Sequence, residues 1–253
     1  MEIQFAGKTD IGVRRNNNED RILVAPELDL FVVADGVGGH RAGEVASQMA
    51  ITAMEDYWSR FRAGDPPAFF HEFDKSLPPM AQHLLNSIQF ANLAIFEAQT
   101  QPQYAGMGST IAAVVLDKAT IWSANVGDSR IYHYNRERLL QISQDHNLAE
   151  DTRLKEIFPN IDVDSKFAKN ALTRALGLAE TVEAFMVPVK PAPGDVVLLC
   201  SDGLTNYVED SAIQLILSDN TTAPEEKVSI LIDRANRGGG GDNISVVLVE
   251  IKN

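Results

Sequence analysis

Four aspartates border short apolar runs that are typical of buried strands. They are Asp20, Asp35, Asp202 and Asp242. A carboxylate at the end of a buried strand lies at the edge of a low-dielectric core, where its charge is costly unless it is paired or bound to a metal ion. Ligands that are all oxygen suit hard cations such as Mg²⁺, Mn²⁺ or Ca²⁺, and no His or Cys cluster has the spacing of a zinc site. The pattern therefore predicts a hard-cation site built from carboxylates.

Glycine follows both of the aspartates that end apolar runs, at Gly36 and Gly203. An isolated Asp-Gly pair is most often a turn, but two pairs at the ends of apolar runs favour a functional site. Glycine lets the backbone turn tightly, so the carbonyl that follows the first aspartate can also approach a ligand. The glycine run 238–241 is typical of a flexible linker, or else lets the backbone pass close to a crowded site. Both interpretations stay open at this point.

Strand pairing would bring the acids together. In an antiparallel hairpin, the start of one strand lies beside the end of its partner. A hairpin over 21–34 would therefore place Asp20 next to Asp35, and Asp242 would lie near Asp202 if their strands are neighbours. Four or more carboxylates at one end of the core would repel one another, so cations are expected among them.

Two further side chains are candidates for chemistry on a phosphate group. Arg15 is a candidate phosphate clamp because a guanidinium matches phosphate oxygens in a bidentate manner; the alternative is a surface arginine, as expected for Arg14. His40 follows the first Asp-Gly pair and could protonate a leaving alkoxide, or could instead cap its loop. The single cysteine, Cys200, lies inside an apolar run, and position 206 is asparagine, so the Cys-x5-Arg loop of cysteine-based phosphatases is absent.

The strands that would position these residues are predicted from short apolar, β-branched runs, several of them joined by short connectors that favour antiparallel hairpins. The runs are 21–25, 30–34, 110–116, 120–126, 130–134, 182–187, 196–200 and 244–251. Helical spacing of apolar residues predicts helices over 42–61, 80–99 and 225–236. Strands in groups, with helices in groups between them, indicate an α+β layered fold. The more polar segment 147–169 is predicted to be a surface excursion.

Composition narrows the class of protein. The 253-residue chain carries a net charge of −13, so nucleic-acid binding is not expected, because phosphate backbones require a basic face. One cysteine permits no intramolecular disulfide. The N-terminal residues lack the pattern of a signal peptide, and no apolar run has the length of a membrane span. We expect one domain over 1–253, located in the cytoplasm and without a membrane partner; nothing argues against a monomer.

In order along the chain, these pieces resemble the metal-dependent protein serine/threonine phosphatase family (type 2C, or PPM), especially its compact bacterial members. The matching motifs are 15–20, Val33-Ala-Asp35-Gly36-Val-Gly-Gly-His40, Gly108-Ser109-Thr110, Asn125-Val-Gly-Asp128-Ser-Arg130, Asp145-His146, Leu172-Thr-Arg174-Ala-Leu-Gly177, Ser201-Asp202-Gly203-Leu204 and Gly241-Asp242-Asn243. Any one of them is weak evidence, but the ordered set spans nearly the whole chain and is specific. The resemblance implies a central sandwich of two antiparallel β-sheets flanked by α-helices, in four αββα layers, with metals at one end.

The resemblance also implies a centre of two Mn²⁺ or Mg²⁺ ions. Asp35 would bridge both ions, the Gly36 carbonyl would bind one of them, and Asp202 and Asp242 would complete the protein ligands.

Other positions would have supporting roles. Glu19 and Asp20 would act largely through bound water, and Asp128 matches a third, weaker metal position. The acid that often accompanies that third site is replaced by Asn206. The segment 147–169 would be a variable flap beside the cleft.

The implied mechanism is attack on phosphorus by a metal-activated water, without a covalent intermediate. Arg15 would hold the phosphoryl oxygens, Asp20 would orient the nucleophile, and His40 would protonate the serine or threonine oxygen as it leaves. The substrates would be phosphorylated proteins, with a bacterial Ser/Thr kinase or its targets as partners. Two alternatives remain: a catalytically silent regulatory scaffold that binds phosphoproteins, and a phosphatase of small molecules. Among these, the complete set Asp35, Asp202 and Asp242 favours an enzyme.

Overall fold

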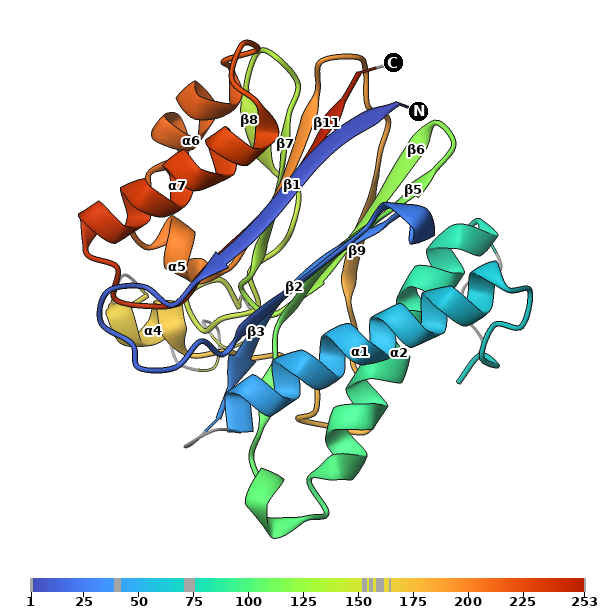
Figure 1. The fold of residues 1–253 in the computed structure, drawn as a ribbon. Helices are drawn as coiled ribbons and strands as arrows, with labels where there is room; N and C mark the ends of the chain where they lie inside the picture. Colours follow the sequence, from blue (N-terminus) through green and yellow to red (C-terminus); the bar gives the residue numbers. More distant parts are fainter. Residues whose placement is uncertain are drawn as a thin grey trace.

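Two antiparallel sheets lie face to face between two layers of helices, and this arrangement confirms the predicted αββα architecture (Figure 1). A computed structural model describes residues 2–38, 42–70, 76–151, 154, 157, 162–163 and 165–252. In the described part of the chain, no helix combines the length and the apolarity needed to cross a membrane.

The first sheet joins the two ends of the chain, because its strand order is β1-β11-β10-β7-β8. Its strands are β1 (Ile3–Asp10), β11 (Ile244–Ile251), β10 (Val196–Cys200), β7 (Arg130–Tyr134) and β8 (Leu139–Gln141). The second sheet has the order β2-β3-β5-β6-β9, with β4 paired to β3. Its strands are β2 (Asp20–Ala25), β3 (Leu30–Val37), β4 (Gly108–Ser109), β5 (Ile111–Asp117), β6 (Thr120–Val126) and β9 (Phe185–Val189).

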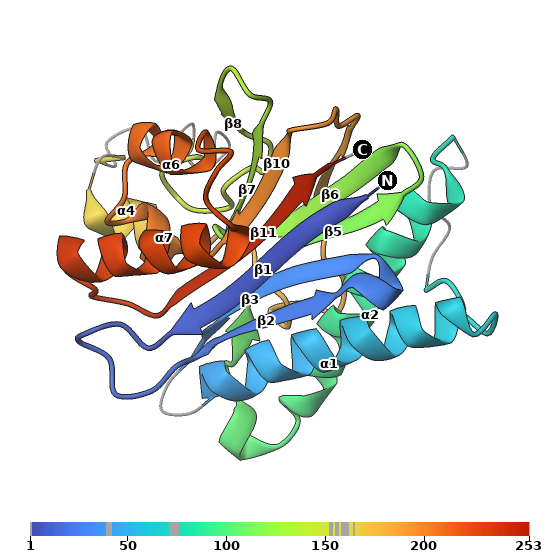
Figure 2. The same ribbon diagram turned by 45° about the horizontal axis from the view of Figure 1, so that its top comes forward.

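Each sheet is covered on its outer face by a pair of helices (Figures 1 and 2). The long helices α1 (Ala42–Arg62) and α2 (Pro79–Ala98) pack on the second sheet. Helices α6 (Asp210–Leu217) and α7 (Pro224–Gly238) pack on the first sheet. The short elements are α4 (Lys166–Asn170), α5 (Asp202–Thr205), and the 3-10 turns Pro26–Leu28 and Pro102–Tyr104.

Strand periodicity divides the core into three apolar layers, because successive side chains point to opposite faces of a sheet. On β3, Phe31 and Val33 lie in the layer between the sheets, whereas Leu30 and Val32 lie under α1 and α2. Each strand with apolar residues on both faces reads as a continuous apolar run, which is why β3 and β10 were recognisable from sequence. The ends of these two buried strands determine where Asp35 and Asp202 lie.

The predicted and observed elements differ at several places. The strand predicted over 182–187 begins later, as β9 (Phe185–Val189). The strands β1 and β8 and the helix α6 were not predicted. The segment 147–169, predicted to be irregular, runs into the helix α4, and many of its residues lie outside the described ranges.

Candidate active site

The hairpin of β2 and β3 sets Asp20 directly opposite Asp35, as predicted from the sequence. The Gly36 amide donates a hydrogen bond to the Glu19 carbonyl oxygen at 3.1 Å, which extends the pairing past the end of β2. Asp20 is 1% exposed, whereas Asp35 and Glu19 are partly exposed. Three acids therefore lie at one end of the second sheet.

The first sheet contributes the other two acids. Strands β10 and β11 are neighbours, with Cys200 opposite Val246, so the predicted pairing of these strands is confirmed. Asp202 begins α5 just beyond β10, and Asp242 lies just before β11. The end of one strand and the start of its antiparallel partner therefore bring Asp202 and Asp242 to the same sheet end.

The glycines after Asp35 and Asp202 are needed for a different reason from the one expected. Neither Gly36 nor Gly203 has a positive φ, so a tight turn is not the requirement. A Cβ on Gly36 would lie 1.9 Å from the Gly43 carbonyl oxygen, and a Cβ on Gly203 would lie 1.8 Å from the Asn243 carbonyl oxygen. Glycine is required because another backbone segment packs directly against each acid-bearing strand end.

Burial and mutual repulsion raise the pKa values of the acids. The pKa of Asp20 is raised to about 7, first by burial and then by Asp202 and Asp242. Burial and Asp242 raise the pKa of Asp202 to about 6, and burial and Asp202 raise that of Asp128 to about 8. The pKa of Asp35 is raised well above its usual value by burial, and then by these same four carboxylates. Acids from both sheets, and from the β6–β7 turn, therefore form one electrostatic cluster.

Asp20 and Asp202 each accept a hydrogen bond from a neutral side chain. The Ser201 hydroxyl donates to Asp20 Oδ2 at 2.7 Å, and Asn206 Nδ2 donates to Asp202 Oδ2 at 2.9 Å. Within the described ranges, no group of three or more His, Cys, Asp or Glu side chains is arranged to hold a metal ion. Asp20 Oδ1, however, is buried and has no hydrogen-bond partner there. A buried carboxylate oxygen without a partner, among acids that repel one another, fits a hard cation or the water bound to one.

Arg15 is the cation next to this cluster. Its Nη2 lies 2.7 Å from Asp242 Oδ2, and its side chain is 48% exposed, so the guanidinium remains accessible from solvent. The Gly240 carbonyl oxygen accepts hydrogen bonds from the amides of Val13, at 2.9 Å, and Arg14, at 3.2 Å. The glycine run thus holds the loop that carries Arg15. This favours the interpretation that the run lets the backbone pass close to a crowded site, and not that it is a flexible linker.

Asn243 fixes the same loop and was not singled out by sequence reasoning. Its Nδ2 donates to the carbonyl oxygens of Ile11, at 3.0 Å, and Asn17, at 2.9 Å, while its Oδ1 accepts from the Glu19 amide at 2.8 Å. With 4% of its surface exposed, this amide is fully used in joining β11 to the segment before β2. The signals in the sequence were its place directly after Asp242 and its inclusion in the motif Gly241-Asp242-Asn243, and neither indicated these partners.

His146 holds the turn that carries Asp128. Its Nδ1 accepts a hydrogen bond from the Gly127 amide at 3.1 Å, and its own amide donates to the Gly127 carbonyl oxygen at 2.9 Å. Burial, and then Arg174, lower the pKa of His146 to about 4, so the imidazole is neutral and can accept. His146, which the sequence singled out only as part of the motif Asp145-His146, is therefore a buried positioning group. His40, the predicted proton donor, lies outside the described residues.

A polar cavity of about 610 Å³ opens beside Asp128 and Asp202. Its other walls include Asn147 and Lys169, from the segment predicted to be a flap, and Arg130. Arg130 is held by Asp145, with Nε 3.0 Å and Nη2 2.7 Å from Asp145 Oδ2.

The chain is similar in sequence and in fold to known protein phosphatases. The sequence model of the family described as Protein phosphatase 2C matches residues 13–229. The chain is 37% identical to the serine/threonine phosphatase stp of Listeria monocytogenes over 99% of its own length and 96% of the relative. It is similar to the serine/threonine phosphatase PstP/Ppp of Mycobacterium tuberculosis, with a TM-score of 0.81, 31% identity and 99% coverage of both chains. The catalytic domain of PstP in complex with two manganese ions gives a TM-score of 0.80 at 30% identity, again over 99% of both chains.

Proposed function

The chain belongs to the protein phosphatase 2C family, and we propose that it hydrolyses phosphoserine and phosphothreonine in proteins with two Mn²⁺ or Mg²⁺ ions held by its acidic cluster. Named protein serine/threonine phosphatases among its relatives support the reaction. The observation that carries the metal assignment is the meeting of Asp20, Asp35, Asp202 and Asp242 from two sheets, with pKa values raised in three of them.

The residues that would hold the ions are Asp35 with the Gly36 carbonyl, Asp202 and Asp242, with Glu19 and Asp20 acting through water and Asp128 at a weaker third site. When bound, the two ions would neutralise phosphate charge and lower the pKa of a coordinated water. Asp20 Oδ1, which has no partner in the described part of the chain, can accept a hydrogen bond from the attacking water and orient it. Ser201 fixes the other oxygen of this carboxylate. His40 remains the predicted donor to the leaving oxygen.

Arg15 would bind the phosphoryl oxygens through the edge of its guanidinium that Asp242 does not use. We therefore expect Arg15→Ala to raise KM for p-nitrophenyl phosphate by roughly tenfold, because a charge-assisted bidentate contact is lost. Steady-state kinetics on the purified variant give the measurement. Arg14→Ala is the matched control and should leave KM unchanged; equal KM values for Arg15→Ala and the unmodified chain would contradict the clamp role.

The proposed function is tested by phosphate release with and without divalent ions. We expect the purified chain to hydrolyse p-nitrophenyl phosphate and a phosphothreonine peptide with Mn²⁺ or Mg²⁺, and to lose this activity in EDTA. A silent scaffold would bind the phosphopeptide without releasing phosphate. A small-molecule phosphatase would prefer a sugar phosphate to the phosphopeptide, and either result would overturn the proposal.

Further expectations belong to this proposal. The residues 147–169 would form a variable flap, since described residues at both ends of this segment line the cavity beside Asp128 and Asp202. The whole chain would act as one catalytic domain, as a monomer in the cytoplasm. Its substrates would include a Ser/Thr kinase or the targets of that kinase.

A further inference from the structure

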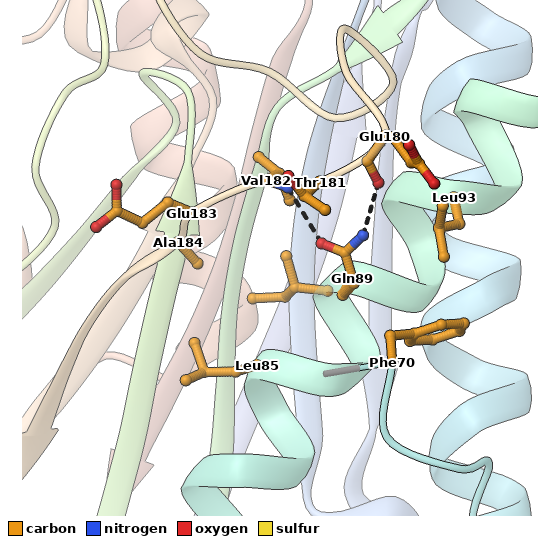
Figure 3. A pocket seen from close by; sticks show the side chains of 10 residues that line it. Phe70, Leu85, Gln89, Leu93, Glu180, Thr181, Val182, Glu183 and Ala184 are labelled. Carbon is orange, nitrogen blue, oxygen red and sulfur yellow. Dashed lines mark hydrogen bonds between the residues drawn. The ribbon is translucent and has the colours of Figure 1, made fainter. Parts of the chain in front are cut away.

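A groove of about 570 Å³ lies between α2 and the segment 180–184 that leads into β9 (Figure 3). The carboxylates of the acidic cluster (Glu19, Asp20, Asp35, Asp128, Asp202 and Asp242) do not line it. Its apolar lining is made by Phe70, Leu85, Ile88, Leu93, Val182 and Ala184. No residue that lines this groove takes part in the proposed catalysis.

The groove is preformed, because buried amides on α2 fix its opposite wall. Gln89 Nε2 donates to the Glu180 carbonyl oxygen at 2.8 Å, and Gln89 Oε1 accepts from the Val182 amide at 3.1 Å (Figure 3). One turn later, Asn92 Nδ2 donates to the carbonyl oxygens of Ala179 and Glu180, both at 3.0 Å. A wall held in this way does not have to be ordered when a ligand binds, so less conformational entropy is lost on binding.

Apolar side chains remain open to solvent along the groove. Phe70 is 45% exposed at one side, and Leu85, Leu93 and Val182 are partly exposed. Concave apolar surface with a few polar groups is the usual character of a ligand site. The aliphatic floor favours an occupant with aliphatic side chains.

The charged residues that line the groove, Glu180 and Glu183, are both acidic. Figure 3 shows the Glu180 carboxylate beside Leu93 at one end of the groove, and the Glu183 carboxylate past Ala184 at the other end, where it points away from α2. No lysine, arginine or histidine is among the lining residues. Glu183 lies 3.5 Å from Arg174 but is 81% exposed, so a second cation can still reach it. Glu180 and Glu183 are three positions apart, so their Cα atoms are separated by at most about 10 Å. Two cations that pair with them would therefore be about three residues apart on an extended ligand.

We propose that this groove is a docking site for an extended segment of the substrate protein, in which aliphatic side chains lie between two basic residues three positions apart. Successive side chains of an extended ligand point to opposite sides, so one aliphatic side chain would occupy the floor and the next would lie against the exposed rim at Phe70. The long, flexible side chains of the two cations would reach Glu180 and Glu183 at the two ends. A second copy of this chain is a poorer occupant, because the chain has 35 acidic against 22 basic residues and like charges would meet. Assigning the occupant to substrates rests on the proposed phosphatase function.

Peptide binding tests the proposal directly. The probe is the fluorescein-labelled, unphosphorylated peptide Gly-Ser-Lys-Leu-Ile-Lys-Ser-Gly, measured by fluorescence polarisation with the full chain in Mg²⁺. One control peptide has Glu in place of both Lys, and another has Ser in place of Leu and Ile. The variants are Leu93→Ser and Glu180→Lys, with Leu215→Ser as the matched control, since Leu215 is a 70% exposed leucine on α6 in the opposite helix layer.

We expect the first peptide alone to bind, Leu93→Ser to weaken its binding by about tenfold because an apolar contact in the groove is lost, and Leu215→Ser to leave it unchanged. Glu180→Lys should weaken the lysine peptide and strengthen the glutamate peptide. Equal binding of all peptides, absence of binding up to millimolar concentration, or insensitivity to Leu93→Ser would overturn the proposal. So would self-association that depends on Leu93 in sedimentation. Hydrolysis of p-nitrophenyl phosphate should be unchanged in all three variants, and its absence in the unmodified chain would count against the proposed function independently of peptide binding.

Discussion

We expect Asp202→Asn to lower the phosphatase turnover number by about 100-fold or more. The same substitution should make the metal-free protein more stable. Asp202 is a proposed metal ligand, and asparagine keeps its shape but not its charge. The amide oxygen can still accept the hydrogen bond from Asn206, so the local structure should persist. Because burial and Asp242 raise the pKa of Asp202 to about 6, the ionised carboxylate destabilises the folded state at pH 7.5, by roughly 1–3 kcal/mol.

Two measurements on this variant separate the metal role from a structural one. Turnover of p-nitrophenyl phosphate against Mn²⁺ concentration should fall, whereas the melting temperature in EDTA should rise by about 2–4 °C for each kcal/mol. Asp233→Asn is the matched control, because Asp233 is exposed on α7 and is not one of the carboxylates of the cluster. Near-normal turnover in Asp202→Asn would contradict the ligand assignment, and a lower melting temperature would contradict the electrostatic account.

In EDTA, the free energy of unfolding is expected to fall as the pH rises from 5 to 8.5. The folded-state pKa values of Asp20, Asp202 and Asp128 are raised to about 7, 6 and 8, against an ordinary value near 3.8. Between pH 4 and 8 the folded state therefore holds more protons than the unfolded state. The stabilisation that these protonated carboxylates provide is fully present below the pKa values of the unfolded state. It is lost as the pH rises through the pKa values of the folded state.

Thermal melts across this pH range, in EDTA and in saturating Mg²⁺, measure the effect. We expect the melting temperature in EDTA to fall by about 5–10 °C over this range, because ionisation of the coupled carboxylates lowers the free energy of unfolding by several kcal/mol. Mg²⁺ should reduce the fall, because bound cations neutralise the same carboxylates. The variant Asp20→Asn should show a shallower slope in EDTA than the unmodified chain. A melting temperature in EDTA that is flat or increases with pH would contradict the prediction.

The parts of the site that sequence predicted are those set by local pattern. Apolar runs on β3 and β10 are continuous because both faces are buried, so their ends, and the acids there, could be located. Antiparallel pairing then placed Asp20 opposite Asp35. The metal roles of these residues came from the family resemblance and stay predictions.

Long-range packing decided the rest. Strand β1 has a weak pattern, interrupted by Gly7, and is a strand because it pairs along its whole length with β11. No local signal shows that Gly203 is required by the backbone of Asn243. The roles of Asn243 and His146 likewise depend on partners far away along the chain.

The acidic cluster is divided between the two sheets, with Asp20 and Asp35 on one and Asp202 and Asp242 on the other. Neither half of the sandwich contains a complete set of carboxylates, and the two sets are separated by more than half of the chain. The centre can therefore form only after segments far apart in the chain have come together, because loop closure over such distances must precede contact between the two sets. A chain in which the two sheets have not yet met would lack the complete set of carboxylates, so we expect it to be unable to hydrolyse phosphate esters.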